Sequence, residues 1–141
     1  MLTASHSGSI AGNFIRKKKG YADYIQNSDS FKCLSRKATF DINKELGINS
    51  DNSFLIRVSG ESMKNAGIST GNTLVVNRSM RPRLRDIVVA SINNELTVKR
   101  LYFDDSGVVL MPENPDYEPI KVKRTDKLDI WGVVTTVLKD V

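Results

Sequence analysis

The sequence predicts a mainly β fold, a compact and coiled or barrel-like β domain that follows an extended N-terminal arm. From residue 53 onward, β-branched runs of strand length alternate with short stretches of turn-forming residues. Before about residue 40, no period of 2 or of 3.6 residues is sustained. The 141 residues, 40% of them hydrophobic, are enough for one ordinary domain with a buried core.

The N-terminal part of the chain differs in composition from the rest. Its apolar residues are scattered among Ser, Asn, Lys and Gly, so residues 1–40 are expected to form the arm, with one turn of helix at "YADYIQ". The stretch "DINKELG" then predicts a short helix that Asp41 caps and Gly47 ends. Residues 41–141 are expected to form the β domain.

Seven runs in the β domain have the length and composition of strands. They are 53–58, 73–77, 86–92, 95–103, 107–111, 120–123 and 129–138. Asn93 and Asn94 separate the third run from the fourth. Because Asn tolerates positive φ, these two strands are expected to form a tight hairpin.

The composition excludes several classes of protein. No segment approaches the roughly 20 apolar residues of a membrane helix, and the N-terminus lacks the pattern of a secretory signal. Cys33 is the only cysteine, which excludes an internal disulfide and is typical of the reducing cytoplasm. The net charge is +5, with basic clusters at 16–20 and 78–85. We interpret both clusters as solvated loops, with a docking surface for a nucleoprotein as the alternative.

Common catalytic and metal sites find no support in the sequence. His6 is the only histidine and lies in the polar N-terminal tail, so a histidine-based triad or metal site would have to recruit that tail. The 16 carboxylates form no spaced ligand pattern, and no phosphate-binding glycine loop is present. No metal or cofactor is therefore expected, and Cys33 is expected to be a small packed residue rather than a nucleophile.

A serine in the stretch "VSGESMKNAG" raises the question of a different kind of site. If Ser62 is a nucleophile it needs a base, and a lysine can serve when burial lowers its pKa. Lys99 is the best candidate, because strand alternation places it on one face with Leu101 and Phe103. Taken singly, a turn serine and a solvent-facing strand lysine remain the simpler alternatives.

Four blocks of sequence, taken together, resemble the self-cleaving serine peptidases of the LexA and UmuD group. The blocks are "FLIRVSGESMKNAGISTGNTLVV", "DIVVASINNELTVKRL", "LMPENPDYEPI" and "DIWGVVTTVL". The resemblance extends from about Asp41 to Val141, and the block order and the 37-residue step from Ser62 to Lys99 follow the family. It implies a β domain of the LexA C-terminal type.

The resemblance also implies roles for individual residues. Ser62 corresponds to the nucleophile and Lys99 to the general base, which later acts as the acid. The backbone N–H of Met63, together with that of Ser62, corresponds to the oxyanion site, and Gly60 to the tight turn before the serine. The family cuts its own arm between a small residue and Gly, so Ala11-Gly12 is the candidate cleavage site.

Within the group, the short N-terminal part without helical periodicity resembles UmuD-type proteins rather than repressors with a helix-turn-helix domain. In those proteins a RecA–single-stranded DNA filament promotes cleavage, and the trimmed homodimer joins the catalytic subunit of a Y-family (UmuC-like) DNA polymerase. This resemblance implies a cytoplasmic protein with no membrane association, no cofactor and no direct sequence-specific DNA binding.

Three features depart from the family pattern. Asn65 and Asn72 replace the usual acidic residues, which is expected to alter local hydrogen bonds only. Gly12 lies 50 residues before Ser62, farther than is usual, and the usual "GFPSPA" after the cut is missing. A non-catalytic β module that docks on a polymerase or on a RecA filament is therefore the main alternative. A signal peptidase is a weaker one, because it normally requires a membrane anchor.

Overall fold

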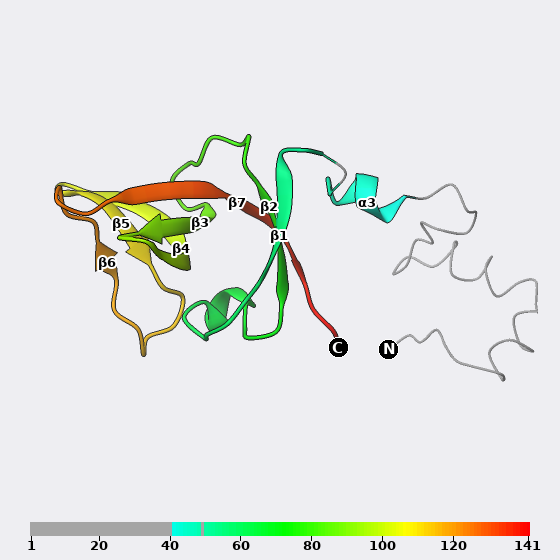
Figure 1. Ribbon diagram of the computed structural model, residues 1–141. Coiled ribbons are helices and arrows are strands. Elements are labelled where there is room, and N and C mark those ends of the chain that lie inside the picture. The colour runs from blue at the N-terminus through cyan, green and yellow to red at the C-terminus, as the bar shows by residue number, and fades with distance from the viewer. Residues whose placement is uncertain (1–40, 49) are drawn as a thin grey trace, which may run out of the picture. The chain divides into compact units, whose positions relative to one another are not determined.

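The computed structural model describes residues 41–48 and 50–141, and it contains seven strands (Figure 1). Their bounds are β1 Ser53–Arg57, β2 Thr73–Asn77, β3 Ile87–Ile92, β4 Glu95–Asp104, β5 Gly107–Met111, β6 Ile120–Lys121 and β7 Leu128–Leu138. The helices are α3, Ile42–Glu45, and the 3-10 helix η1, Lys64–Ala66. The expected helical turn at "YADYIQ", His6 and Cys33 lie outside the described residues.

All seven strands belong to one antiparallel sheet in the order β1-β2-β7-β3-β4-β5-β6. The long strand β7 joins strands β1 and β2 to strands β3 to β6. It pairs with β2 along its second half and with β3 along its first half (Figure 1). The pairing shifts register between Val75 and Val76 and again between Val89 and Ala90, and such irregularities increase the twist of a sheet. The predicted mainly β fold is confirmed.

The turns agree with the chemistry of their residues. Asn93 and Asn94 have φ values of 51° and 71°, which confirms the predicted hairpin between β3 and β4. Gly47 has a φ of 69° and donates its N–H to the carbonyl of Lys44, as expected of a residue that ends a helix. None of the helices in the described part of the chain is long and apolar enough to cross a membrane.

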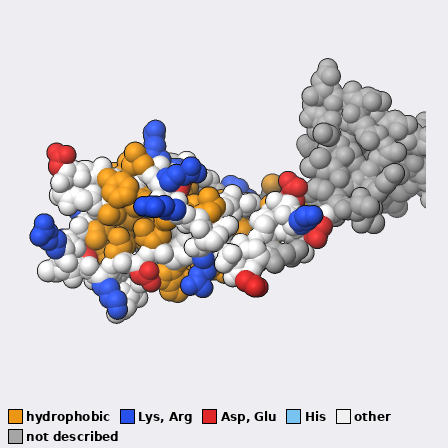
Figure 2. All heavy atoms as spheres, turned by 90° about the horizontal axis from the view of Figure 1, so that it is seen from above, with side chains coloured by type: hydrophobic (Ala, Val, Ile, Leu, Met, Phe, Trp, Pro, Cys, Tyr) orange, Lys and Arg blue, Asp and Glu red, His pale blue; other side chains and the backbone are white. Residues whose placement is uncertain are grey.

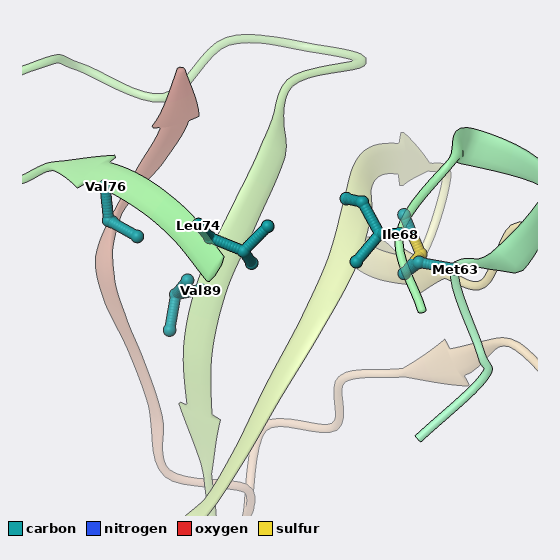
Figure 3. Close-up of a cluster of buried hydrophobic side chains, with 5 residues drawn as sticks. All are labelled: Met63, Ile68, Leu74, Val76 and Val89. Carbon is teal, nitrogen blue, oxygen red and sulfur yellow. The ribbon is translucent and has the colours of Figure 1, made fainter. Parts of the chain in front are cut away.

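Two hydrophobic clusters form the core. The first consists of the buried residues Met63, Ile68, Leu74, Val76 and Val89, shown in Figure 3. The second consists of Val88, Ala90, Leu101, Leu110 and Val133. Neighbouring residues of β3 thus belong to different clusters, because successive side chains of a strand point to opposite faces. Met63 ties the segment that follows β1 to the first cluster, and this segment carries Ser62.

Candidate active site

The segment after β1 is held in a fixed turn around Ser62. Gly60 has a φ of 120°, a backbone conformation that side chains with a Cβ rarely adopt. Its N–H donates to the hydroxyl of Thr70 at 2.8 Å, and the N–H of Thr70 donates to the carboxylate of Glu61 at 2.9 Å. That backbone hydrogen bond is the main reason why the pKa of Glu61 is lowered. Thr70 therefore clamps the two residues that precede Ser62.

The loop between β5 and β6 supports Ser62 from another direction. The N–H of Glu113 donates to the carbonyl of Ser62 at 2.8 Å, and the side-chain amide of Asn114 donates to the carbonyl of Glu61 at 2.9 Å. The Glu113 carboxylate is in turn paired with the Arg100 guanidinium of β4. Because Arg100 directly follows Lys99, β4 positions both the lysine and the loop that supports the serine.

Lys99 lies next to Ser62 in the folded chain. Its Nζ is 2.9 Å from the Oγ of Ser62, 2.6 Å from the Oγ1 of Thr97 and 3.2 Å from the carbonyl oxygen of Val98. The side chain is held within one strand, since Thr97 and Val98 are its own neighbours in β4. These three contacts orient the amine toward the serine.

Burial lowers the pKa of Lys99. The residue is only 7% exposed, and across the sheet it faces Val88, which is fully buried. Desolvation lowers the pKa of Lys99 below the ordinary value of 10.5, because the ammonium form loses its hydration. No carboxylate within residues 41–48 and 50–141 forms an ion pair with it to oppose this effect. The amine is therefore easier to deprotonate than that of a solvated lysine.

The structure corrects one part of the sequence interpretation. Phe103 was expected to share the apolar surroundings of Lys99, but it is 55% exposed at the end of β4. Leu101, by contrast, is buried as expected. The alternation of β4 is regular, but the core covers only its middle, so a residue four positions beyond Lys99 does not help to desolvate it.

The backbone donors next to Ser62 are available to a ligand. In the described part of the chain, nothing accepts a hydrogen bond from the N–H of Ser62 or of Met63. The Met63 side chain is 2% exposed, so its position is fixed by core packing. Two adjacent N–H groups without an internal partner can hold an oxyanion that forms at Ser62.

Ser62 and Lys99 open into a cleft of about 320 Å³. One side is formed by β1 and the residues after it, and the other by the start of β4 and by Tyr117. The apolar side chains that line it are Ile56, Val58, Met63, Ile68, Leu96 and Val98. The part of the cleft beside Ser62 and Lys99 is therefore largely apolar.

Several site residues were not singled out from the sequence. Thr97 lies two residues before Lys99 and therefore on the same strand face, and this spacing was a usable signal for its contact with the lysine. Glu113 and Asn114 lie in a block that carried the family resemblance, also without a role. Of the atypical residues, Asn72 accepts the N–H of Ser69 at 2.8 Å. Asn65 binds the Glu113 carbonyl through its backbone N–H, for which no particular side chain is required.

The candidate cleavage site, Ala11-Gly12, lies outside the described residues. Ser62, Lys99, the two backbone donors and the cleft all lie within residues 50–141.

Comparison with known proteins identifies a family. A family model described as Peptidase S24-like matches residues 18–135, so the match begins earlier than the resemblance seen from about Asp41. Proteins named LexA repressor are similar to the chain. The one from Erwinia tasmaniensis is 47% identical over 88 residues, which cover 62% of this chain and 44% of the relative.

Two further LexA repressors match the chain with similar coverage and with 36% and 46% identity. The protein from Acidithiobacillus ferrooxidans is 46% identical over 89 residues, covering 61% of this chain and 43% of the relative. The protein from Bordetella petrii is 36% identical over 103 residues, covering 70% of this chain and 46% of the relative. The chain thus spans less than half the length of these curated relatives.

Proposed function

The chain belongs to the Peptidase S24-like family, and we propose that it is a serine endopeptidase that cuts its own N-terminal arm with Ser62 as nucleophile and Lys99 as base. The observation that carries this proposal is the 2.9 Å contact between Lys99 Nζ and Ser62 Oγ in a site where burial lowers the pKa of the lysine. A lysine that is merely solvated could not accept a proton near neutral pH.

The reaction proceeds in two stages. Neutral Lys99 takes the proton from Ser62 as the serine oxygen attacks the scissile carbonyl, and the resulting ammonium gives that proton to the leaving amine as the peptide bond breaks. A water then attacks the serine ester, with Lys99 again taking the proton and returning it to the serine oxygen. The N–H groups of Ser62 and Met63 stabilise the oxyanion in both stages, which is worth about 3 kcal/mol in comparable sites.

The substrate in this proposal is the bond between Ala11 and Gly12. The apolar cleft beside Ser62 suits the small Ala11 and the preceding Ile10. A substrate that is covalently attached to its enzyme needs little binding affinity, because tethering gives it a high effective concentration. A cleft of modest depth is sufficient for such a reaction.

The biological setting is a further part of the proposal. A cytoplasmic homodimer whose cleavage a RecA–single-stranded DNA filament stimulates, and which then serves a Y-family DNA polymerase as an accessory subunit, agrees with the family. The named relatives are repressors, and the chain matches less than half of their length. Repression of transcription is therefore the alternative setting for the same peptidase chemistry.

Incubation of the purified full chain tests the chemistry. We expect a fragment of about the first eleven residues to be released at a rate that rises with pH and levels off below the ordinary lysine pKa of 10.5, because neutral Lys99 is the active form. Mass spectrometry of the products measures the rate and identifies the bond. A rate that does not change between about pH 7 and 10 would count against a lysine base. A chain that stays intact even with the filament would favour the non-catalytic module.

Replacing Thr97 with Val should slow cleavage about five- to tenfold at high pH, since the variant loses one hydrogen bond that orients Lys99. The midpoint of the pH–rate curve should move to lower pH, because loss of an acceptor disfavours the ammonium form. Thr97→Ser keeps the hydroxyl and is expected to restore both values. An unchanged midpoint in Thr97→Val would show that the hydroxyl does not affect Lys99.

A further inference from the structure

The loop between β2 and β3 carries a group of arginines that the peptidase chemistry does not use. Arg81, Arg83 and Arg85 alternate along this loop and are all exposed. In the described part of the chain, none of the three forms an ion pair. Arg78, at the start of the loop, is different because it lines a separate hollow together with Asp51 and Asp129. The cationic surface therefore consists of the three later arginines.

This loop has an ordered backbone. The side chain of Asn77 accepts the N–H groups of Ser79 and Met80 at 2.8 and 3.1 Å, and Met80 packs against the second core cluster. At the other end, the Asp86 carboxylate accepts the N–H of Arg83 at 2.8 Å. Asp86 is thus engaged with the backbone, and its single charge is outweighed by the three guanidinium groups. Because the loop is already ordered, binding a ligand costs less conformational entropy.

Exposed apolar side chains lie close to these arginines. Leu84, between two of them, is 54% exposed. The N–H of Arg85 donates to the carbonyl of Leu101 at 2.8 Å, which brings the loop beside the end of β4 that carries the exposed Phe103. Figure 2 shows Lys and Arg side chains bordering a hydrophobic area on one face of the molecule. A surface that alternates guanidinium groups with apolar and aromatic side chains has the composition of a single-strand nucleic-acid site.

We propose that Arg81, Arg83 and Arg85, together with Phe103, form a sequence-independent contact site for single-stranded nucleic acid. The guanidinium groups bind phosphates, for which their planar fork of donors is well shaped. Phe103 offers its exposed ring to an unpaired base, a contact that duplex DNA does not provide. This site is separate from the Ser62–Lys99 chemistry, so its test does not depend on self-cleavage.

The test is a titration of the full chain against a fluorescent oligothymidylate of about 20 nucleotides, followed by anisotropy at several salt concentrations. The double variant Arg81→Ala with Arg83→Ala should bind about tenfold more weakly, as expected for the loss of two exposed ion pairs. Its slope of log affinity against log salt should be smaller by about 1.4, because each single-strand phosphate contact contributes about 0.7. Phe103→Ala should weaken binding with the slope unchanged.

The matched control removes the same charge elsewhere. Arg124→Ala with Lys127→Ala changes two exposed cations in the turn between β6 and β7, which contacts Asn93 at the opposite end of β3 from the arginines. This control should bind like the unchanged chain, and thermal melts should show that all variants fold. The proposal is overturned if the unchanged chain does not bind, if both double variants weaken binding equally, if a duplex competes as well as the single strand, or if only an acidic peptide depends on the loop.

Discussion

The variant Lys99→Met is expected to lose self-cleavage by a factor of about 10⁴ or more, because removal of a base that acts as a unit with its nucleophile removes most of the catalysis. Methionine keeps a long apolar side chain in the buried position and removes only the amine that contacts Ser62. The measurement is the amount of released fragment over time at the optimal pH. Lys64→Met is the control, since Lys64 is an exposed lysine next to the same serine segment.

The same substitution should stabilise the fold. At pH 7 the unfolded chain carries a solvated ammonium, whereas folding buries this group without a carboxylate partner among the described residues. Loss of this cost should raise the free energy of unfolding by about 1 kcal/mol, after allowance for the hydrogen bonds that Thr97 and Val98 lose. Urea denaturation of the variant and of the unchanged chain measures this difference in the free energy of unfolding.

The burial of Lys99 should also make the free energy of unfolding depend on pH. The folded pKa of Lys99 is lowered, so between that pKa and 10.5 the unfolded chain binds more protons than the folded one. The Lys99 contribution therefore makes the chain more stable as pH rises through this window, and Lys99→Met should lack that rise. The gain from Lys99→Met is thus greatest below the folded pKa and disappears near 10.5. A variant that is less stable than the unchanged chain at pH 7 would contradict this account of the burial.

Much of the sheet could be predicted because strand signals are local. β2 and β5 begin and end where their β-branched runs do, and the Asn93-Asn94 turn follows from the tolerance of Asn for positive φ. The order of the strands in the sheet could not be predicted in this way. β7 comes last in the chain but lies between β2 and β3 in the sheet. That insertion is a long-range pairing, and no local pattern in the sequence predicts it.

The candidate site also has a part that could be predicted from local sequence and a part that depends on long-range contacts. Ser62 and Lys99 were reached by elimination of histidine, by strand alternation and by resemblance, and the structure places their reactive atoms 2.9 Å apart. The supporting contacts of Glu113 and Asn114 were not foreseen, because these residues bind backbone carbonyls about fifty positions earlier in the chain. The exposure of Phe103 was also missed, since alternation identifies a face of a strand but not how far the core extends along it.

Ser62→Ala is expected to abolish self-cleavage while leaving the fold intact. The substitution removes only the hydroxyl, and the segment around it stays clamped by Thr70 and Glu113. Stability should change by no more than about 1 kcal/mol, because Ser62 is half-buried and Lys99 keeps its two contacts within β4. Mass spectrometry after prolonged incubation at alkaline pH measures the cleavage, and a thermal melt measures the fold.

Ser59→Ala is the matched control for this variant, because Ser59 lines the same cleft three residues earlier and its hydroxyl makes no hydrogen bond in the described part of the chain. Its rate should stay within about threefold of the unchanged chain, as expected for a surface position. If Ser62→Ala still releases the fragment, another residue is the nucleophile, and the 2.9 Å contact with Lys99 serves only to satisfy a buried amine. If both serine variants fail, the cleft requires its full hydroxyl lining to bind the arm. The covalent step is assigned to Ser62 only if Ser62→Ala loses self-cleavage and Ser59→Ala retains it.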